Sequence, residues 1–487
     1  MEGRIRRSST RVSLSSHDIA DLRASLSTSL RQSAEWQHSF ADYRDQSAEE
    51  KRSYTKREYL ILFSMCLANL ADFLMYSVLA PFFPTLATKM GASPTQVGLV
   101  FGCYSLTMFL LSPVFGKLIP VLGAKFIFLA GSFTGGCTCI IFGFLDRLEP
   151  GAMFIGFCFA TRILEAVGAA ASSTGAYAIL ASTFRHNIAT AFGAAEIFCG
   201  LGLMIGPPVG GALYQVGGYS LPFIVWGSFC VAIVAVNYFI VPDEKEECKK
   251  TASLIELLKI PSVIVTSICV LAGFMGIGFL DPTLADHLSQ FNLTSTQVGL
   301  MFLVNSGAYA VSAFFWGWLT DKYNIPKVLM IVGNLASVAG YLYVGPSPFF
   351  NMDSSLAVVA VSLVLLGLSL AASVLPTFNE MVSSARWYGM EENLGTYGII
   401  SGLFSGLFSL GNFLGPTVGS ALASNIGFDR TATLFSAMYA VVALILIVFC
   451  LWEYRCGGQR RAPPSRQKLA NSSIQNGYDN ERRPLIS

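Results

Sequence analysis

Twelve long hydrophobic stretches run along the chain, and short polar or glycine-containing segments separate each of them from the next. About 20 apolar residues suffice to cross the ~30 Å hydrocarbon core of a bilayer as a helix, because a helix rises ~1.5 Å per residue. The pattern therefore predicts twelve membrane-spanning helices. They cover residues 59–84, 96–118, 124–145, 151–181, 188–215, 219–241, 261–285, 296–319, 326–345, 355–383, 395–424 and 430–453.

The predicted spans divide into two sets of six that resemble each other. The first set contains the run TQVGL at 95–99, which recurs at 296–300, an offset of 201 residues (296 − 95 = 201). Gly206 and the proline after it recur at Gly415, an offset of 209 residues (415 − 206 = 209). We therefore predict an all-α membrane protein with two pseudo-symmetric six-helix halves. Duplicated units of this kind place a substrate path at their interface, near the membrane midplane.

Polar segments flank and divide the two sets of spans. Residues 1–57 and 454–487 are polar and carry mixed charge, so we predict disordered tails. The charged segment 243–260 separates a first bundle at 58–242 from a second bundle at 261–453. Most basic loop residues fall on the side of the two tails, which predicts that both termini are cytosolic.

Composition excludes an ordinary soluble protein, because 53% of the residues are apolar and only 13% are charged. The net charge of +2 is spread over the chain, so nothing indicates a nucleic-acid partner. Most of the eleven cysteines fall inside the predicted spans, where cysteine behaves as a small apolar residue. No disulfide framework or metal-binding spacing is visible, so we predict no metal and no cofactor.

The first predicted span carries one acid, Asp72, among apolar residues. It lies about thirteen residues into the span, roughly 20 Å deep, and a charge at that depth is costly unless it serves a function. Tyr76 falls one turn later on the same helix face and Asn69 one turn earlier. A carboxylate beside an aromatic ring suits an organic cation. The alternative is a structural aspartate paired with a neighbouring helix.

Two further acids lie in the first set of spans. Arg162 and Glu165 share one face of the fourth span, where they can neutralise each other, and protonating Glu165 would free Arg162 to pair elsewhere. We predict a proton-coupling role for this pair, with a static ion pair as the alternative. Glu196, in the fifth span, adds another buried acid to the predicted proton-coupling set.

The second set of spans supplies acids that face those of the first. Asp281 lies in the luminal part of the seventh span, where Pro282 frees a carbonyl and makes a polar notch. Glu380 lies towards the cytosolic side of the tenth span. Carboxylates spread along one path fit a long polycation better than a compact monoamine. We therefore predict that Asp72, Tyr76, Asp281 and Glu380 bind substrate.

Sequence motifs give the chain a resemblance to the major facilitator superfamily over nearly all of its membrane part. The run GWLTDK at 317–322 is similar to the family loop that latches the cytosolic gate by charge pairing, which implies gate roles for Gly317, Asp321 and Lys322. The counterpart in the first half carries Pro120 in place of the acid. The resemblance thus implies a latch built mainly on Asp321.

Two other motifs resemble those of proton-exchanging family members. Arg162 followed by Gly168 is similar to a motif associated with proton transfer. The run GLMIGPPVGG at 202–211 resembles the antiporter signature, in which small residues let helices approach closely and proline bends the helix. The residues that carry this signature are Gly202, Gly206, Pro207 and Gly210.

A narrower resemblance is to the vesicular amine transporters. Asp72 with the run PFFP at 81–84, and FLDP at 279–282, carry this likeness. The runs PTFNE at 376–380 and SGLF at 401–404 resemble the polyamine branch of that family. The resemblance implies exchange of luminal protons for cytosolic polyamines such as spermidine and spermine, driven by a proton pump.

The end of the sequence resembles a sorting signal. Glu481, Leu485 and Ile486 match the acidic dileucine pattern that clathrin adaptors bind. With the family resemblance, this implies a multi-pass protein of secretory or synaptic vesicles or of endo-lysosomes.

Three other functions stay open alongside a proton/polyamine antiporter. The first is a monoamine or multidrug exporter with the same coupling. The second is a non-transporting membrane scaffold or receptor of this fold, which the buried acids disfavour because a degenerate carrier has no need to bear their cost. The third, an intramembrane enzyme, is disfavoured because the chain has no His/Cys cluster, nucleophile elbow or phosphate-binding loop.

Overall fold

A computed structural model describes residues 55–79, 83–185, 187–242, 253–293, 295–347 and 355–456. Within these ranges every regular element is a helix, and twelve helices are long and apolar enough to cross a membrane. The predicted all-α membrane fold is confirmed. The predicted tails lie almost wholly outside the described residues, as do much of the linker and the sorting signal at Glu481, Leu485 and Ile486.

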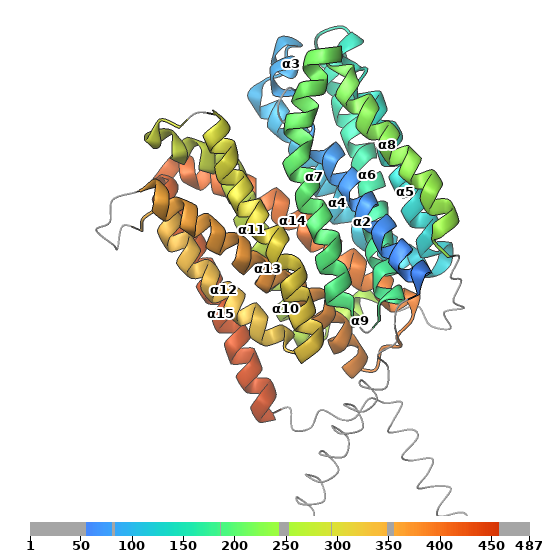
Figure 1. Ribbon diagram of the computed structural model, residues 1–487, viewed down its shortest axis with the longest axis vertical. Coiled ribbons are helices and arrows are strands. Elements are labelled where there is room, and N and C mark those ends of the chain that lie inside the picture. The colour runs from blue at the N-terminus through green and yellow to red at the C-terminus, as the bar shows by residue number, and fades with distance from the viewer. Residues whose placement is uncertain are drawn as a thin grey trace, which may run out of the picture. The chain divides into compact units, whose positions relative to one another are not determined.

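The helices follow one another with short connections (Figure 1, blue to red along the chain). The first half contains α2 (Lys56–Ser77), α3 (Phe83–Lys89), α4 (Pro94–Leu122), α5 (Ala124–Phe142), the short η1 (Leu145–Arg147), α6 (Ala152–Thr183), α7 (Ile188–Gly217) and α8 (Ser220–Ile240). The second half contains α9 (Leu254–Leu258), α10 (Pro261–Leu288), η2 (Ser289–Phe291), α11 (Ser295–Tyr323), α12 (Pro326–Val344), α13 (Leu356–Trp387), α14 (Leu394–Ile426) and α15 (Phe428–Cys456).

Most predicted spans agree with these helices to within a few residues, and the first span is the exception. We expected one helix over 59–84, but α2 ends at Ser77 and the separate α3 begins at Phe83. Prolines at 81 and 84 lack the backbone N–H that one continuous helix over 59–84 would use, which disfavours such a helix. Asp72 therefore lies only about one and a half turns before the end of its helix.

Packing within the two halves follows the internal repeat. In the first half α5 packs on α6 and α8, and α4 packs on α6. In the second half α12 packs on α13 and α15, and α11 packs on α13. Leu60–Ser487 forms one compact unit that includes both halves. The boundaries proposed for separate bundles therefore stay a prediction.

The two halves meet where α4 packs on α14 and α7 packs on α11. Small residues bring the backbones together there. A Cβ placed on Gly402 would lie 2.5 Å from the carbonyl oxygen of Ser112, and one on Gly193 would lie 2.7 Å from the carbonyl oxygen of Ala313. Real Cβ atoms do not approach so closely, so larger residues at these positions would push the halves apart.

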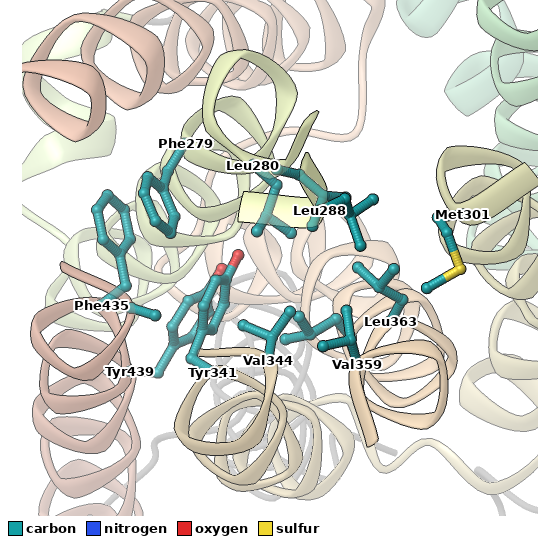
Figure 2. Packing of buried hydrophobic residues seen from close by; sticks show 13 residues of the cluster. Phe279, Leu280, Leu288, Met301, Tyr341, Val344, Val359, Leu363, Phe435 and Tyr439 are labelled. Carbon is teal, nitrogen blue, oxygen red and sulfur yellow. The ribbon is translucent and has the colours of Figure 1, made fainter. Parts of the chain in front are cut away.

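Stacked rings fix α10 against α12 and α15. The ring centroids of Phe279 and Phe435 are 4.5 Å apart, and those of Tyr341 and Tyr439 are 5.2 Å apart (Figure 2). The Tyr439 hydroxyl donates a 3.0 Å hydrogen bond to the carbonyl oxygen of Ala272. This apolar cluster holds the segment of α10 that immediately precedes Asp281.

Candidate functional site: a buried carboxylate path

The side chain of Asp72 is hydrogen-bonded to one neighbouring helix, α6, and through it is linked to α5. Ser172, on α6, donates a 2.8 Å hydrogen bond to Asp72 Oδ2. The hydroxyl oxygens of Ser172 and Ser132, on α5, are also 2.8 Å apart. Asp72 is half-buried and forms no ion pair with any described residue. The alternative of a structural aspartate paired with a neighbouring helix therefore stays open, because Ser172 of α6 is such a partner, although it is a neutral one.

Aromatic rings connect the surroundings of Asp72 to Arg162. The rings of Tyr76 and Tyr104 are 5.3 Å apart. The guanidinium carbon of Arg162 lies 4.3 Å from the centroid of the Tyr104 ring, within cation–π range. Asn69 is only 3% exposed, and its amide nitrogen has no hydrogen-bond partner among the described residues.

Arg162 and Glu165 form the ion pair that their spacing predicts. Arg162 Nη1 lies 2.8 Å from Glu165 Oε2, and both side chains are buried. The Nε and Nη2 atoms of Arg162 have no hydrogen-bond partner within the described part of the chain. Glu165 also lies within electrostatic range of Asp72. A buried guanidinium with unused donors costs free energy, so it is poised to take another acceptor.

Glu196 joins the two halves through two tyrosines. The Tyr177 hydroxyl, on α6, donates to Glu196 Oε1 at 3.3 Å, and the Tyr309 hydroxyl, on α11, donates to Oε2 at 2.9 Å. Glu196 is 7% exposed and forms no ion pair with a described residue. One of its two donors belongs to each half, so separating the halves here would break a hydrogen bond.

A four-ring cluster lies beside Glu196, made of Tyr177 (α6), Phe192 (α7), Phe378 (α13) and Phe404 (α14). The centroids of Tyr177 and Phe192 are 4.8 Å apart, those of Phe192 and Phe378 are 4.0 Å apart, and those of Phe378 and Phe404 are 5.7 Å apart. Both halves contribute rings. The cluster therefore forms an apolar layer that connects the halves next to Glu196.

The antiporter signature packs α7 directly onto the helix of Asp72. A Cβ placed on Gly202 would lie 2.8 Å from the Cβ of Phe73, and one on Gly206 would collide with the Ser77 hydroxyl. That hydroxyl also donates a 3.2 Å hydrogen bond to the carbonyl oxygen of Gly202. Gly202 and Gly206 therefore hold α7 against α2 just after Asp72. The remaining residues of the signature, Pro207 and Gly210, are half-buried and buried respectively.

The same contact recurs in the second half. A Cβ on Gly411 would lie 2.6 Å from the Cβ of Phe274, and one on Gly415 would lie 2.5 Å from the carbonyl oxygen of Met275. These glycines follow Gly202 and Gly206 by the 209-residue offset (411 − 202 = 209). The helix pair α10–α14 thus repeats the glycine contact between α2 and α7, but the repeat of Asp72 is a glycine, Gly273 (72 + 201 = 273).

Asp321, in the predicted gate loop, crosses between the halves at the start of α7. Its Oδ1 accepts a 3.3 Å hydrogen bond from the backbone of Ala189, and its Oδ2 accepts a 2.7 Å bond from the backbone of Thr190. Gly317 packs so closely on Ala189 that a Cβ would not fit. Lys322 instead lies over the Trp318 ring, 4.4 Å from its centroid. Within the described ranges, Asp321 thus pairs with a helix N-terminus and forms no ion pair with a lysine.

The first-half counterpart of this latch has no carboxylate. The N-cap of α14, Asn393, accepts a 2.9 Å hydrogen bond from the backbone of Thr396 and so caps its own helix. Asn187, at the N-cap of α7, makes no such side-chain cap bond. Asp321 supplies that cap from the other half. The asymmetry agrees with Pro120 standing where the acid would be.

Asp281 lies on α10 and is exposed. The helix continues past Pro282 to Leu288, three residues beyond the predicted end of the seventh span (288 − 285 = 3). Asp281 lies within electrostatic range of Tyr76, which belongs to the other half. The structure thus brings Asp72, Tyr76 and Asp281 into one region.

Glu380 is placed apart from this region. Its Oε1 accepts hydrogen bonds from Ser262 at 2.8 Å and from Ser384 at 2.9 Å, and it lies 3.0 Å from Lys327 Nζ. Lys327 also pairs with Glu453 at 2.5 Å. All these partners belong to the second half. The arrangement favours a brace among α10, α12, α13 and α15 over contact with a substrate.

Comparison with known proteins settles the family. The Major Facilitator Superfamily profile matches residues 65–288 and 266–486. The chain belongs to the major facilitator superfamily. It is 40% identical over 443 residues to the human "MFS-type transporter SLC18B1", covering 90% of this chain and 95% of that protein.

More distant members of the superfamily carry amine transporter names. The human "Chromaffin granule amine transporter" is 26% identical over 387 residues, covering 77% of this chain and 67% of that protein. The structure of the proton:xylose symporter XylE aligns with a TM-score of 0.69 at 12% identity, over 82% of this chain and 96% of that one. That likeness shows the major facilitator fold alone.

Sequence reasoning missed the aromatic part of this major facilitator site. The chain has 37 phenylalanines and 18 tyrosines, so a ring in a span carries little signal by itself. Tyr309 is 113 residues from Glu196, and nothing in the sequence pairs them. The one signal in the sequence was Glu196 itself. An acid buried inside a span needs hydrogen-bond donors nearby, and those donors turn out to be tyrosine hydroxyls.

Proposed function

We propose that this major facilitator protein is a proton-coupled antiporter that loads polyamines, or related organic amines, from the cytosol into acidic vesicles. The observation that carries the proposal is Asp72. It is a carboxylate inside the membrane part, held by a serine hydroxyl and without a cationic partner among the described residues. A carboxylate in the membrane part is costly unless a positive charge or a proton compensates it, so Asp72 suits a site whose cation is the substrate.

Three acids extend along the proposed path and support a polyvalent substrate. Asp281 and Asp72 lie on opposite halves with Tyr76 near both, and Glu196 lies on α7 beyond Tyr177. The aromatic rings between the acids supply cation–π attraction to an ammonium group. The names of the amine-transporting relatives point in the same direction.

Proton coupling is assigned to Glu165 and Arg162. When Glu165 takes a proton, the pair loses its attraction, and the unused donors of Arg162 become available to a different acceptor. Asp72 lies within electrostatic range of Glu165, so a proton on one carboxylate changes the affinity of the other for a cation. That reciprocity is what an exchanger of protons for amines requires.

In an alternating-access cycle the two halves rock against each other, so the contacts between them must break on the side that opens. In the conformation described, the halves are joined by the Asp321 cap on α7, by the Tyr309–Glu196 hydrogen bond and by the four-ring cluster. All three lie towards the end where α7 begins, which the charge pattern predicts to be cytosolic. Opening to that side must break them, while Asp281 at the other end is already exposed.

Uptake into proteoliposomes tests the function. The purified full chain, reconstituted with an imposed pH gradient, should accumulate labelled spermidine. Parallel assays with serotonin and with a quaternary ammonium drug separate the polyamine proposal from the monoamine and multidrug alternatives. No uptake of any amine by folded protein would instead favour a scaffold or receptor.

The proposed organelle rests only on the acidic dileucine motif near the end of the sequence. Glu481, Leu485 and Ile486 would bind a clathrin adaptor and direct the protein to secretory or synaptic vesicles or endo-lysosomes, where a proton pump supplies the gradient. Replacing Leu485 and Ile486 by alanine should move the protein to the cell surface, and unchanged vesicle targeting would contradict the signal.

A further inference from the structure

We infer that Glu196 and Tyr177 form a second ammonium subsite, so that a diamine is held with one nitrogen on Asp72 and the other on Glu196. The inference rests on the proposed function and deepens it. It assigns to Glu196 a substrate role in place of a role in proton transfer alone. It also names the substrate class, amines with two positive charges separated by a short methylene chain.

Both carboxylates are hydrogen-bonded to side chains of α6. Asp72 bonds to Ser172 and Glu196 bonds to Tyr177, five residues further along that helix, which corresponds to ~7.5 Å of rise. The nitrogens of 1,4-diaminobutane are joined by five single bonds of ~1.5 Å and lie about 6 Å apart when extended. With an ammonium–carboxylate contact of ~2.8 Å at each end, the extended diamine reaches carboxylate oxygens up to about 12 Å apart, which covers this rise together with the sideways offset between two side chains on different faces of α6.

The groups between the two acids fit a cationic chain. The Tyr177 hydroxyl and the Cys199 thiol each lie within electrostatic range of both carboxylates. Asn69 lies one turn from Asp72 on the same face of α2, and its carboxamide oxygen can accept a hydrogen bond from an ammonium group.

Glu196 retains capacity for an ammonium. A carboxylate offers about four acceptor positions, and the described partners of Glu196 use two of them. Both partners are neutral hydroxyls, so they leave the negative charge uncompensated. A diamine across Asp72 and Glu196 would neutralise both charges, whereas a monoamine neutralises one.

Equilibrium binding measures the subsite without any gradient. The full chain in lipid nanodiscs is titrated with butylamine and with diamines from 1,3-diaminopropane to 1,8-diaminooctane. We expect 1,4-diaminobutane to bind roughly tenfold more tightly than butylamine. Glu196→Gln should remove that preference and leave butylamine affinity within about twofold. Glu256→Gln, at an exposed acid on the short α9, is the matched control and should change neither affinity.

A second variant separates a subsite from a structural role. Glu196→Asp keeps the charge but withdraws the carboxylate by one methylene, so the preferred diamine should shift from 1,4-diaminobutane to 1,5-diaminopentane. If Glu196→Gln weakens butylamine and the diamine equally, or if the diamine preference persists, the subsite is wrong while amine binding stands. If the unaltered chain binds no amine at all, the proposed function fails, and the subsite with it.

Discussion

Asp321 caps a helix of the other half: its Oδ2 accepts a 2.7 Å hydrogen bond from the backbone of Thr190 and a 2.6 Å bond from the Thr190 hydroxyl. The carboxylate thereby meets both the free N–H groups and the positive end of the α7 dipole. A conformational change that parts α7 from α11 must expose these groups. The strength of this one contact therefore biases which side of the protein is open.

Replacing Asp321 by asparagine should favour opening of the end where α7 begins. The variant keeps an acceptor but loses the charge at the helix N-terminus, about 1 kcal/mol, which is roughly a fivefold change in the ratio of conformations. Labelling of Cys199 by a membrane-impermeant maleimide, with the other cysteines replaced, reports that opening. Lys322→Gln is the contrast. If it opened the protein as much as Asp321→Asn, the latch would depend on charge pairing after all.

Asp72→Asn should reduce spermidine uptake to background while protein level and thermal stability persist. The amide oxygen can still accept the hydrogen bond from Ser172, so the helix contacts remain, but the charge that attracts the ammonium is gone. A contact with a charged group contributes about 1.5–3 kcal/mol, which corresponds to a loss of roughly 10- to 100-fold. Normal uptake by the folded variant would refute the assignment of Asp72.

Gly206→Ala should destabilise the protein and impair transport, because the added methyl group collides with the Ser77 side chain on α2. Overpacking of this kind costs about 1–3 kcal/mol. Gly211→Ala is the matched control on the same helix, since a Cβ there has no atom within 4 Å. Thermal unfolding in detergent should separate the two variants. Equal melting temperatures would show that α7 and α2 do not depend on this contact.

The spans were predictable because hydropathy is a property of local sequence, and in a bilayer it is decisive. The end of α2 at Ser77 was not predictable. Prolines are often tolerated inside membrane helices, because neighbouring groups can donate hydrogen bonds to the carbonyl oxygens that proline leaves unpaired. The place of Asp72 inside an apolar helix and the pairing of Arg162 with Glu165 followed from position and helical spacing. Those predictions needed only one helix at a time.

Contacts between helices could not be predicted from the sequence. Glu380 carries the same chemistry as Asp72, yet Lys327 and Ser262 hold it within the second half. Which acid faces the other half depends on how each helix is rotated in its bundle, and the apolar residues on all sides of a membrane helix leave that rotation without a sequence signal. The pairing of Glu196 with Tyr309 was hidden for the same reason.

Glu165→Gln should abolish uptake driven by a pH gradient but preserve exchange of internal for external spermidine. Glutamine cannot take up and release a proton, while its carbonyl oxygen can still accept from Arg162 Nη1. Exchange of substrate for substrate moves no net protons, so it tests the path separately from the coupling. Equal loss of both activities would indicate a static ion pair that merely holds the fourth span in place.

The final prediction concerns the driving force. A tri- or tetravalent cation that enters a positive lumen works against ~2.3 kcal/mol per charge per 100 mV, whereas each departing proton gains from that potential and contributes a further ~1.4 kcal/mol per pH unit. Accumulation therefore requires that several protons leave, or that the pH gradient is large and the potential small. Nigericin, which collapses the pH gradient, should stop spermidine uptake more completely than valinomycin, which collapses the potential. Uptake that survived nigericin and followed an inside-negative voltage would make the protein a facilitator, and the antiporter interpretation of Gly202, Gly206, Pro207 and Gly210 would then be wrong.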